Sequence, residues 1–166
     1  MTRVVGLQPK HFVWIVPRRL AASERPGGQG KVHRRVRRDE ELAWIRQSRI
    51  TRVLSLLGSV HNIDAYAAAG ITAAHIPVER PTDALEKQSE IYSWLDDVLS
   101  SPAEAVLVHL DDFNDILCGV LAGYLVHSGM VPSGPVAVAL VERITSRPLG
   151  PEGRQIAFSA RPPAGA

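Results

Sequence analysis

The sequence is poor in several features that would assign it to a particular class of protein. It holds one cysteine, Cys118, in 166 residues, so no disulfide can form within the chain and folding requires no oxidising compartment. The apolar run at residues 12–16 is far too short to cross a bilayer, and residues 1–10 lack the apolar stretch of a signal peptide. These absences favour a cytoplasmic protein without a membrane span.

Aromatic residues are also scarce, at 5%, while hydrophobic residues make up 45% and charged residues 22% of the chain. The last two values are ordinary for a globular protein, and the length suits one domain with its own core. We therefore predict a single domain over residues 1–160, which includes a basic N-terminal arm and loop at 1–38. A flexible tail is expected at 161–166.

The net charge of +2 hides a strong asymmetry along the chain. Residues 1–38 have a charge balance of +9, and residues 39–166 have a balance of −7. The basic residues that follow the Gly-rich stretch 26–30 form a candidate anion or partner patch: Lys31, Arg34, Arg35, Arg37 and Arg38. Such a patch can attract nucleic acid, a phosphoprotein or an anionic lipid surface. No aromatic platform or known nucleic-acid motif accompanies it, so a solvated loop folded back on the acidic body remains the plain alternative.

From residue 39 onward, helical and strand patterns alternate. The acidic turn at 39–41 predicts the start of a helix, and Asp83 with Glu86 resembles a capping box. Predicted strands are 52–57, 71–78 and 105–109, and predicted helices are 62–69, 83–100, 116–128, 134–146 and 151–160. This alternation predicts an α/β fold with a mostly parallel central sheet flanked by helices on both faces. Ligands of such sheets bind where strands end, which directs attention to the loop after Val108.

The strand at 106–109, the loop after it and the helical segment 119–126 together resemble the active-site unit of the dual-specificity branch of the protein tyrosine phosphatase family. In that family a buried strand ends in His-Cys, five loop residues follow, and an arginine precedes the helix. Other segments of the chain resemble segments of bacterial members of the family and occur in the same order. They extend the resemblance to roughly residues 12–160 and are 12–17 with 20–23, 50–56, 69–78 and 151–158. The resemblance implies a protein tyrosine phosphatase-like fold.

The resemblance also places residues of this chain in roles that they cannot perform. The degenerate phosphate-loop positions are His109, Leu110, Asp111, Asp112, Phe113, Asn114, Asp115 and Ile116. Leu110 stands at the nucleophile position, Ile116 at the arginine position, and Phe113 where the family usually has glycine. The degenerate general-acid loop holds Glu79, Arg80 and Asp83, with Arg80 closest to the acid's position. Because a thiolate, a phosphate-binding arginine and a general acid are all required, we predict a pseudophosphatase, a pseudoenzyme that needs no cofactor.

The acidic residues of the loop add a repulsive contribution. Asp111, Asp112 and Asp115 put negative charge where a phosphate would bind, and each like-charge contact at ~4 Å costs about 4 kcal/mol at an effective dielectric near 20. We therefore expect them to exclude phosphate. Asn114 or Asp115 can also cap the helix expected from Ile116 and occupy its free N–H groups. Simple capping in a solvated loop is the alternative for these residues.

Several other functions remain open at this stage. His109 with Asp111, Asp112, Asn114 and Asp115 could bind a divalent metal, most plainly through Asp111, Asp112 and Asp115, and make the chain a hydrolase that reuses the fold, although the spacing matches no calcium loop. Residual phosphatase activity would need another nucleophile, and Cys118 is expected to be inert packing inside an apolar helix. His109 is itself expected to hydrogen-bond the loop backbone. The pseudophosphatase itself is expected to be a protein-binding or regulatory module that recognises another protein through the face of the former phosphate pocket or through the basic arm. A third possibility is a protein that only keeps the fold and binds its partner elsewhere on the surface.

Overall fold

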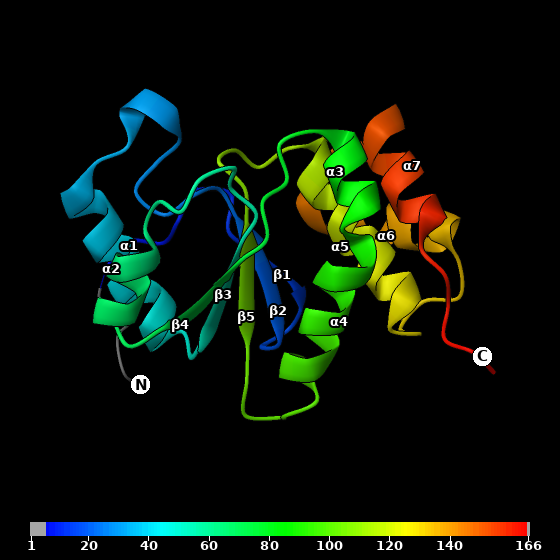
Figure 1. Cartoon of the computed structure of the whole chain (residues 1–166), viewed down its shortest axis with the longest axis horizontal. Coiled ribbons are helices and arrows are strands. Elements are labelled where there is room, and N and C mark those ends of the chain that lie inside the picture. Colours follow the sequence, from blue (N-terminus) through cyan, green and yellow to red (C-terminus); the bar gives the residue numbers. More distant parts are fainter. Residues whose placement is uncertain (1–5, 166) are drawn as a thin grey trace. The chain divides into compact units, whose positions relative to one another are not determined.

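A computed structural model of the chain describes residues 6–165 (Figure 1). The first five residues of the predicted basic arm and Ala166 of the predicted tail lie outside the described residues. The chain divides into two compact units. One, here called the sheet unit, extends to Pro77 and includes Ser101–Phe113, and the other, the helical unit, comprises Val78–Ser100 and the chain from Asn114. The single domain over residues 1–160 stays a prediction.

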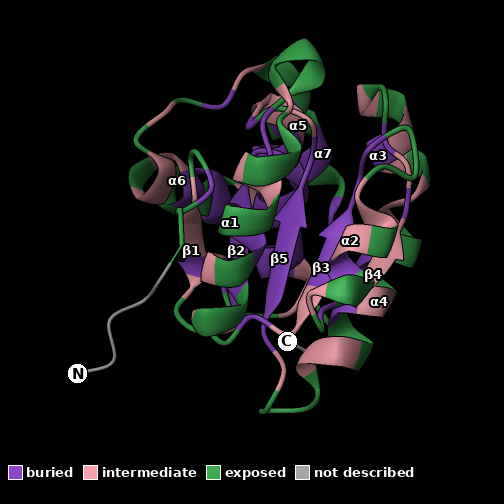
Figure 2. Ribbon diagram, turned by 90° about the vertical axis from the view of Figure 1, so that its left-hand side faces the viewer, coloured by how far each residue is buried: buried purple, intermediate pink, exposed green. Residues whose placement is uncertain are grey.

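The sheet unit contains a five-stranded sheet of order β1-β2-β5-β3-β4. Its strands are β1 (Val13–Val16), β2 (Leu20–Ser23), β3 (Arg52–Ser55), β4 (Thr72–His75) and β5 (Val106–His109). β1 is antiparallel to β2, and every other pair is parallel. β5 lies between β2 and β3 and is buried along its whole length, as expected for a central strand of apolar residues (Figure 2).

The core of the sheet unit forms where two helices meet the sheet. α1 (Arg35–Gln47) buries Leu42 and Ile45, and α2 (Ile63–Ala68) buries Tyr66. These side chains cluster with sheet residues such as Val53 and Leu107. A short 3-10 turn, η1 (Gly30–Val32), precedes α1 and follows the Gly-rich stretch. α1 and α2 therefore pack against the part of the sheet that includes Val53 of β3 and Leu107 of β5.

The helical unit contains the remaining five helices: α3 (Pro81–Glu86), α4 (Gln88–Leu99), α5 (Asp115–His127), α6 (Gly134–Thr145) and α7 (Pro151–Ser159). α5 packs against α6 and α7, and every residue from Leu117 to Val126 is buried. A helix that is apolar on all sides is the expected centre of such an assembly. Within residues 6–165, no helix has the length and apolar character needed to cross a membrane.

The predicted α/β class with a mostly parallel sheet is confirmed, but two helix predictions are wrong. The first helix begins at Arg35, inside the basic segment, and has no acid in its first turn. The helix predicted over 83–100 is two helices separated at Lys87. The predicted capping box between Asp83 and Glu86 is also wrong. Arg80 is the N-cap residue of α3, and its backbone N–H donates a hydrogen bond to the side chain of Asp83.

Candidate functional site

The first part of the predicted phosphate loop begins at His109, the last residue of β5. The parallel register places His109 beside Ser23 of β2 and Ser55 of β3, and the imidazole is fully buried. Its Nδ1 lies 3.1 Å from the carbonyl oxygen of Leu110 and its Nε2 lies 2.7 Å from the Tyr66 hydroxyl. A carbonyl only accepts, so Nδ1 carries the proton and Nε2 accepts from the tyrosine. The predicted hydrogen bond from His109 to the loop backbone is confirmed.

Burial makes His109 a neutral residue at physiological pH. Removal from water disfavours the imidazolium and lowers the pKa of His109 to about 4, although the Leu110 carbonyl opposes the shift. Burial also raises the pKa of Tyr66, so that its hydroxyl remains a proton donor. The pair therefore fixes the end of β5 through two uncharged hydrogen bonds. It offers no proton for chemistry near neutral pH.

We expect the buried His109 to make the protein less stable as the pH falls from about 6.5 to about 4. An unfolded chain binds a proton at His109 near pH 6.5, whereas the folded chain binds it only near the lowered pKa of about 4. Across that window the free energy of unfolding should fall by on the order of 3 kcal/mol from this residue alone. Urea unfolding of wild type and His109→Gln at several pH values measures the difference. Parallel pH curves for the two proteins would contradict the assignment.

Apolar side chains fill two positions where the family places functional residues. Leu110, at the nucleophile position, is 6% exposed, and Phe113, at the glycine position, is also 6% exposed. The Phe113 ring lies 6.0 Å from the His11 ring, centroid to centroid. Neither side chain carries a nucleophilic atom or an anion-binding group. This half of the loop is therefore part of a packed apolar region in the sheet unit.

The acids in the sheet-unit half of the loop have partners of their own. Asp111 accepts a hydrogen bond from the Gly30 backbone N–H at 3.1 Å, and its carboxylate lies 3.6 Å from Nη1 of Arg25. Asp112 is exposed and accepts a hydrogen bond from the N–H of Phe113 at 2.8 Å. These two side chains are thus directed to the Gly-rich stretch and to the loop backbone.

The helical-unit half of the loop forms the start of α5. Asn114, one of the two predicted caps, is the N-cap of a helix that begins one residue earlier than predicted, and its Oδ1 accepts from the Leu117 N–H at 3.0 Å. Asp115 accepts from the N–H groups of Gly150 and Gly153, both at 2.7 Å. Ile116, at the arginine position, is partly exposed and can make no charged contact. The first turn of α5 is therefore already capped by its own residues.

The sequence suggested three carboxylates around a phosphate-binding loop. In the structure each of these carboxylates has a partner within the chain. Asp111 is paired within the sheet unit, Asp115 is paired with the start of α7, and the exposed Asp112 is bonded to the loop backbone. In the described part of the chain, no group of three or more His, Cys, Asp or Glu side chains could hold a metal ion. The aspartates suggested as metal ligands do not form such a group.

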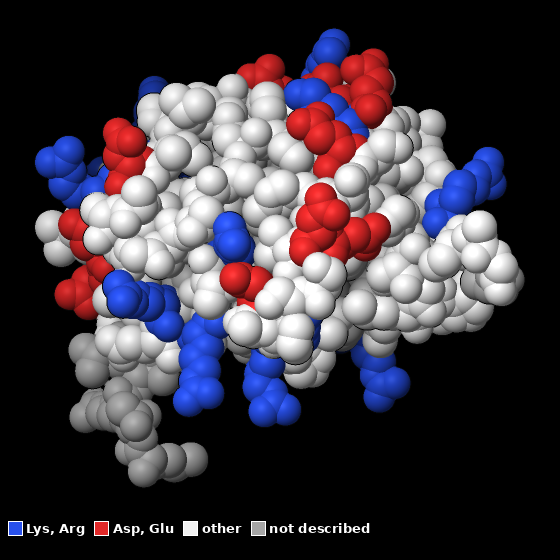
Figure 3. Space-filling model, turned by 60° about the horizontal axis from the view of Figure 1, so that its bottom comes forward, with Lys and Arg blue, Asp and Glu red and all other residues white. Residues whose placement is uncertain are grey.

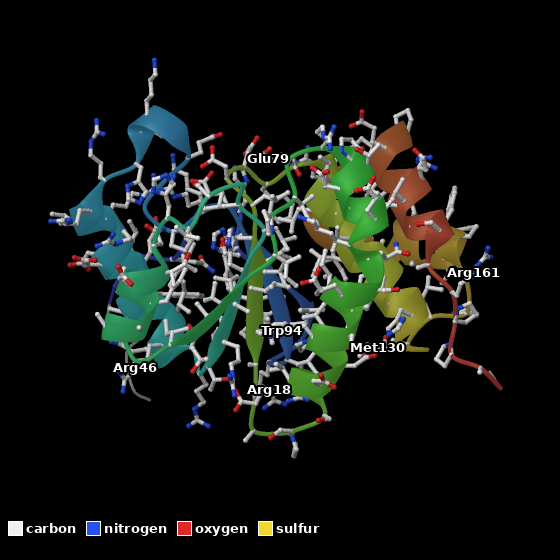
Figure 4. The ribbon with its side chains drawn as sticks, viewed as in Figure 1. Arg18, Arg46, Glu79, Trp94, Met130 and Arg161 are labelled. Carbon is white, nitrogen blue, oxygen red and sulfur yellow. The ribbon has the colours of Figure 1, made fainter. Side chains whose placement is uncertain are left out.

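Cys118 and the predicted general-acid loop offer no substitute chemistry. Cys118 is fully buried in α5, and burial raises the pKa of its thiol to about 11, so a thiolate is disfavoured. Hydrogen bonds from the side chain and backbone of Arg80 lower the pKa of Asp83 to about 2. Asp83 is therefore ionised at neutral pH and cannot donate a proton. Glu79 is exposed at the start of this loop (Figure 4).

The candidate basic patch is divided between exposed and internally paired residues. Lys31, Arg34 and Arg35 are exposed. Arg37 is bound to Glu24 at 3.0 Å and Glu41 at 2.6 Å, and Arg38 is paired with the adjacent Asp39 at 3.1 Å. On the face shown in Figure 3, Lys and Arg side chains are interspersed with Asp and Glu. The internal pairing of Arg37 and Arg38 makes the patch itself less suited to nucleic acid than a continuous basic stripe would be.

Sequence reasoning missed a buried ionic network next to the loop. Glu24 and Glu41 are 2% and 0% exposed, and both bind the guanidinium of Arg37. Glu41 also accepts from the Gly27 N–H at 2.8 Å. Arg25, between Glu24 and the Gly-rich stretch, is 8% exposed. One signal was available, because Glu24 is the only acid among residues 1–38 and directly follows segment 20–23, one of the segments that resemble the family.

The fold assembled from these elements is that of the cysteine-dependent protein phosphatases, the protein tyrosine and dual-specificity class. The comparison with solved structures carries this assignment, since no family model and no curated protein matches the sequence. The PTP-2 phosphatase of Cydia pomonella is similar with a TM-score of 0.68 and 14% identity, covering 89% of this chain and 88% of that one. Tk-PTP gives 0.68 and 18% identity over 88% and 92%, and human DUSP28 gives 0.67 and 15% identity over 91% and 94%.

Proposed function

We propose that this protein is a catalytically inactive member of the phosphatase-fold proteins that acts as a protein-binding or regulatory module. The observation that carries the proposal is Leu110, a buried side chain without a nucleophilic atom at the position that resembles the family's cysteine. Phosphoryl transfer through a covalent intermediate needs a nucleophile of lowered pKa. The one cysteine of the chain has a raised pKa and is fully buried.

Three further features support the loss of catalysis. Ile116 cannot supply the positive charge that stabilises a transferring phosphoryl group. Asn114 accepts from the α5 N–H of Leu117, a group of the kind that binds phosphate at a helix start. Asp83 is held ionised by Arg80 and cannot protonate a leaving group. The phosphate-binding charge, the helix N–H groups and the general acid are thus each affected by a different residue.

We expect the purified protein to release no phosphate from an aryl phosphate above the uncatalysed rate. The assay should be run with and without divalent metal ions and repeated with Cys118→Ser, which is expected to change nothing. Turnover that disappears in Cys118→Ser would overturn the proposal and make the cysteine a nucleophile. Metal-dependent turnover lost in the Asp111→Asn, Asp112→Asn double variant would favour a hydrolase that reuses the fold.

The partner is proposed to be another protein. The exposed members of the basic patch, Lys31, Arg34 and Arg35, give such a partner an accessible cationic surface. Surface charges of this kind steer association and make it sensitive to salt. A location in the cytoplasm remains a prediction from the sequence.

A further inference from the structure

Arg25 is a buried cation with too few partners. Its side chain is 10% exposed, and within the described chain its Nε atom has no hydrogen-bond partner. The nearest carboxylate in an ion pair with it is Asp111, whose Oδ1 lies 3.6 Å from Nη1, beyond good hydrogen-bond distance. Arginine stays charged in proteins, and a buried charge without full pairing is costly. The deficit therefore points to an acceptor that belongs beside Arg25.

A second buried nitrogen without a partner lies in the same region, but its chemistry is different. Nε2 of His33 is buried and unpartnered within the described residues. His33 is close enough to Arg25 for the guanidinium charge to lower its pKa, after the larger effect of burial. Its ring lies against Gly27, where a Cβ would come within 2.5 Å of Nε2. The ring also hydrogen-bonds the Pro26 carbonyl and the Asn62 side chain, so a neutral His33 that donates to Pro26 leaves Nε2 as an acceptor, and the missing acceptor is that of Arg25.

The contacts of Asp111 show that a negatively charged oxygen can bind next to Arg25. Its carboxylate receives the Gly30 N–H at 3.1 Å and approaches Arg25, while its carbonyl oxygen receives the Arg25 backbone N–H at 3.2 Å. The Asp111 side chain is 47% exposed, so it lies at the surface side of the buried arginine. A carboxylate oxygen is therefore already held at the edge of the region by its own chain. It leaves the Nε edge of the guanidinium unused.

We propose that Arg25 and the backbone N–H of Gly30 form a binding site for a phosphate group, and that the Asp111 carboxylate is its built-in competitor. A guanidinium presents donors in a fork that matches two oxygens of a phosphate. A phosphate dianion also gains more than a carboxylate from the nearby Lys31, Arg34 and Arg35, which are exposed. The site lies wholly in the sheet unit and uses none of the residues that the family employs for catalysis, so it holds whether or not the protein turns over phosphate.

The test is isothermal titration calorimetry of the full chain with inorganic phosphate at low salt. Asp111→Asn should bind phosphate about tenfold or more tightly than wild type, because a competing charge-assisted contact is removed. Arg25→Gln should weaken binding by at least about tenfold for the converse reason. Asp112→Asn is the matched control: it makes the same charge change one residue away, where the carboxylate contacts only the loop backbone. It should alter affinity less than about twofold.

Two outcomes would overturn the proposal. One is equal affinity of the Asp111→Asn and Asp112→Asn proteins for phosphate, which would mean a general charge effect. The other is unchanged affinity in a folded Arg25→Gln protein, which would leave Arg25 with a buried water as its partner. If Arg25→Gln fails to fold, the test moves to nitrogen NMR of the wild type. There, phosphate must shift the Arg25 Nε and Gly30 amide resonances, and signals that do not move would refute the site.

A further pair of titrations distinguishes the sources of the phosphate group. A phosphorylated peptide that binds Asp111→Asn at least about tenfold more tightly than inorganic phosphate, while its unphosphorylated form does not bind, would identify a phosphoprotein ligand. Equal affinity for the peptide and for inorganic phosphate would identify free phosphate or a small phosphate ester. Both results support the site. Binding of acetate as tightly as phosphate would contradict the preference for a dianion.

Discussion

Glu41→Gln is expected to lower the free energy of unfolding by about 3 kcal/mol, the lower end of the cost of breaking a buried ion pair. The Glu41 carboxylate is completely buried and accepts two hydrogen bonds, from Nε of Arg37 at 2.6 Å and from the Gly27 N–H at 2.8 Å. Both partners are donors, so the amide group of a glutamine would have to face one of them with a donor of its own. Urea denaturation followed by circular dichroism measures the loss.

Glu40→Gln is the matched control for this substitution. It makes the same chemical change at the adjacent position of α1, where the side chain is exposed, and should alter the free energy of unfolding by less than about 0.5 kcal/mol. Equal effects of the two substitutions would contradict the ionic network. The remaining bond from Arg37 to Glu24, at 3.0 Å, explains why the expected loss is not larger.

The same network explains why the start of α1 was misplaced. Acidic residues at 39–41 suit the first turn of a helix, and basic residues there are unfavourable for the helix dipole. The helix nevertheless begins at Arg35, because Arg37 is neutralised by Glu24 and Glu41. Glu24 lies thirteen residues away in the chain, so a local pattern could not reveal the contact. Tertiary pairing here overrides a local preference.

The boundary at Lys87 was missed for a different reason. Apolar residues on either side of it continue the helical spacing, so periodicity gives no break between α3 and α4. The start of α3 did carry a local signal. Pro81 is its first residue, a position that proline favours because no intrahelical N–H is needed there. Proline was therefore a better guide to this helix start than the acids at 83 and 86.

The candidate site was predictable in position but not in detail. The order of strand, loop and apolar helix placed the loop at the end of β5, and the identities of Leu110 and Phe113 led to the prediction of an inactive protein. The partners of the acidic residues could not be predicted. Gly30 lies 81 residues from Asp111, and Gly150 lies 35 residues from Asp115. Backbone donors carry no sequence signature, so only the fold shows that these carboxylates are already bound.

Asp115→Ala is expected to destabilise the protein by about 3 kcal/mol, because it removes two charge-assisted hydrogen bonds worth roughly 1.5–3 kcal/mol each and the solvent regains part of the loss. The carboxylate binds the N–H groups of Gly150 and Gly153, the N-cap and an early residue of α7. A negative charge at that place also favours the helix dipole. Asp115 thus occupies the start of α7 as a bound anion would.

Asp112→Ala provides the comparison for Asp115→Ala, since its exposed carboxylate accepts the next backbone N–H. It should change the free energy of unfolding by less than about 1 kcal/mol. Amide hydrogen exchange adds a local readout: α7 should lose protection in Asp115→Ala and keep it in Asp112→Ala. Unchanged α7 protection in both variants would mean that the Asp115 contacts contribute little. A selective loss would show that an acid placed in the old phosphate loop now stabilises the fold, whichever ligand the protein binds.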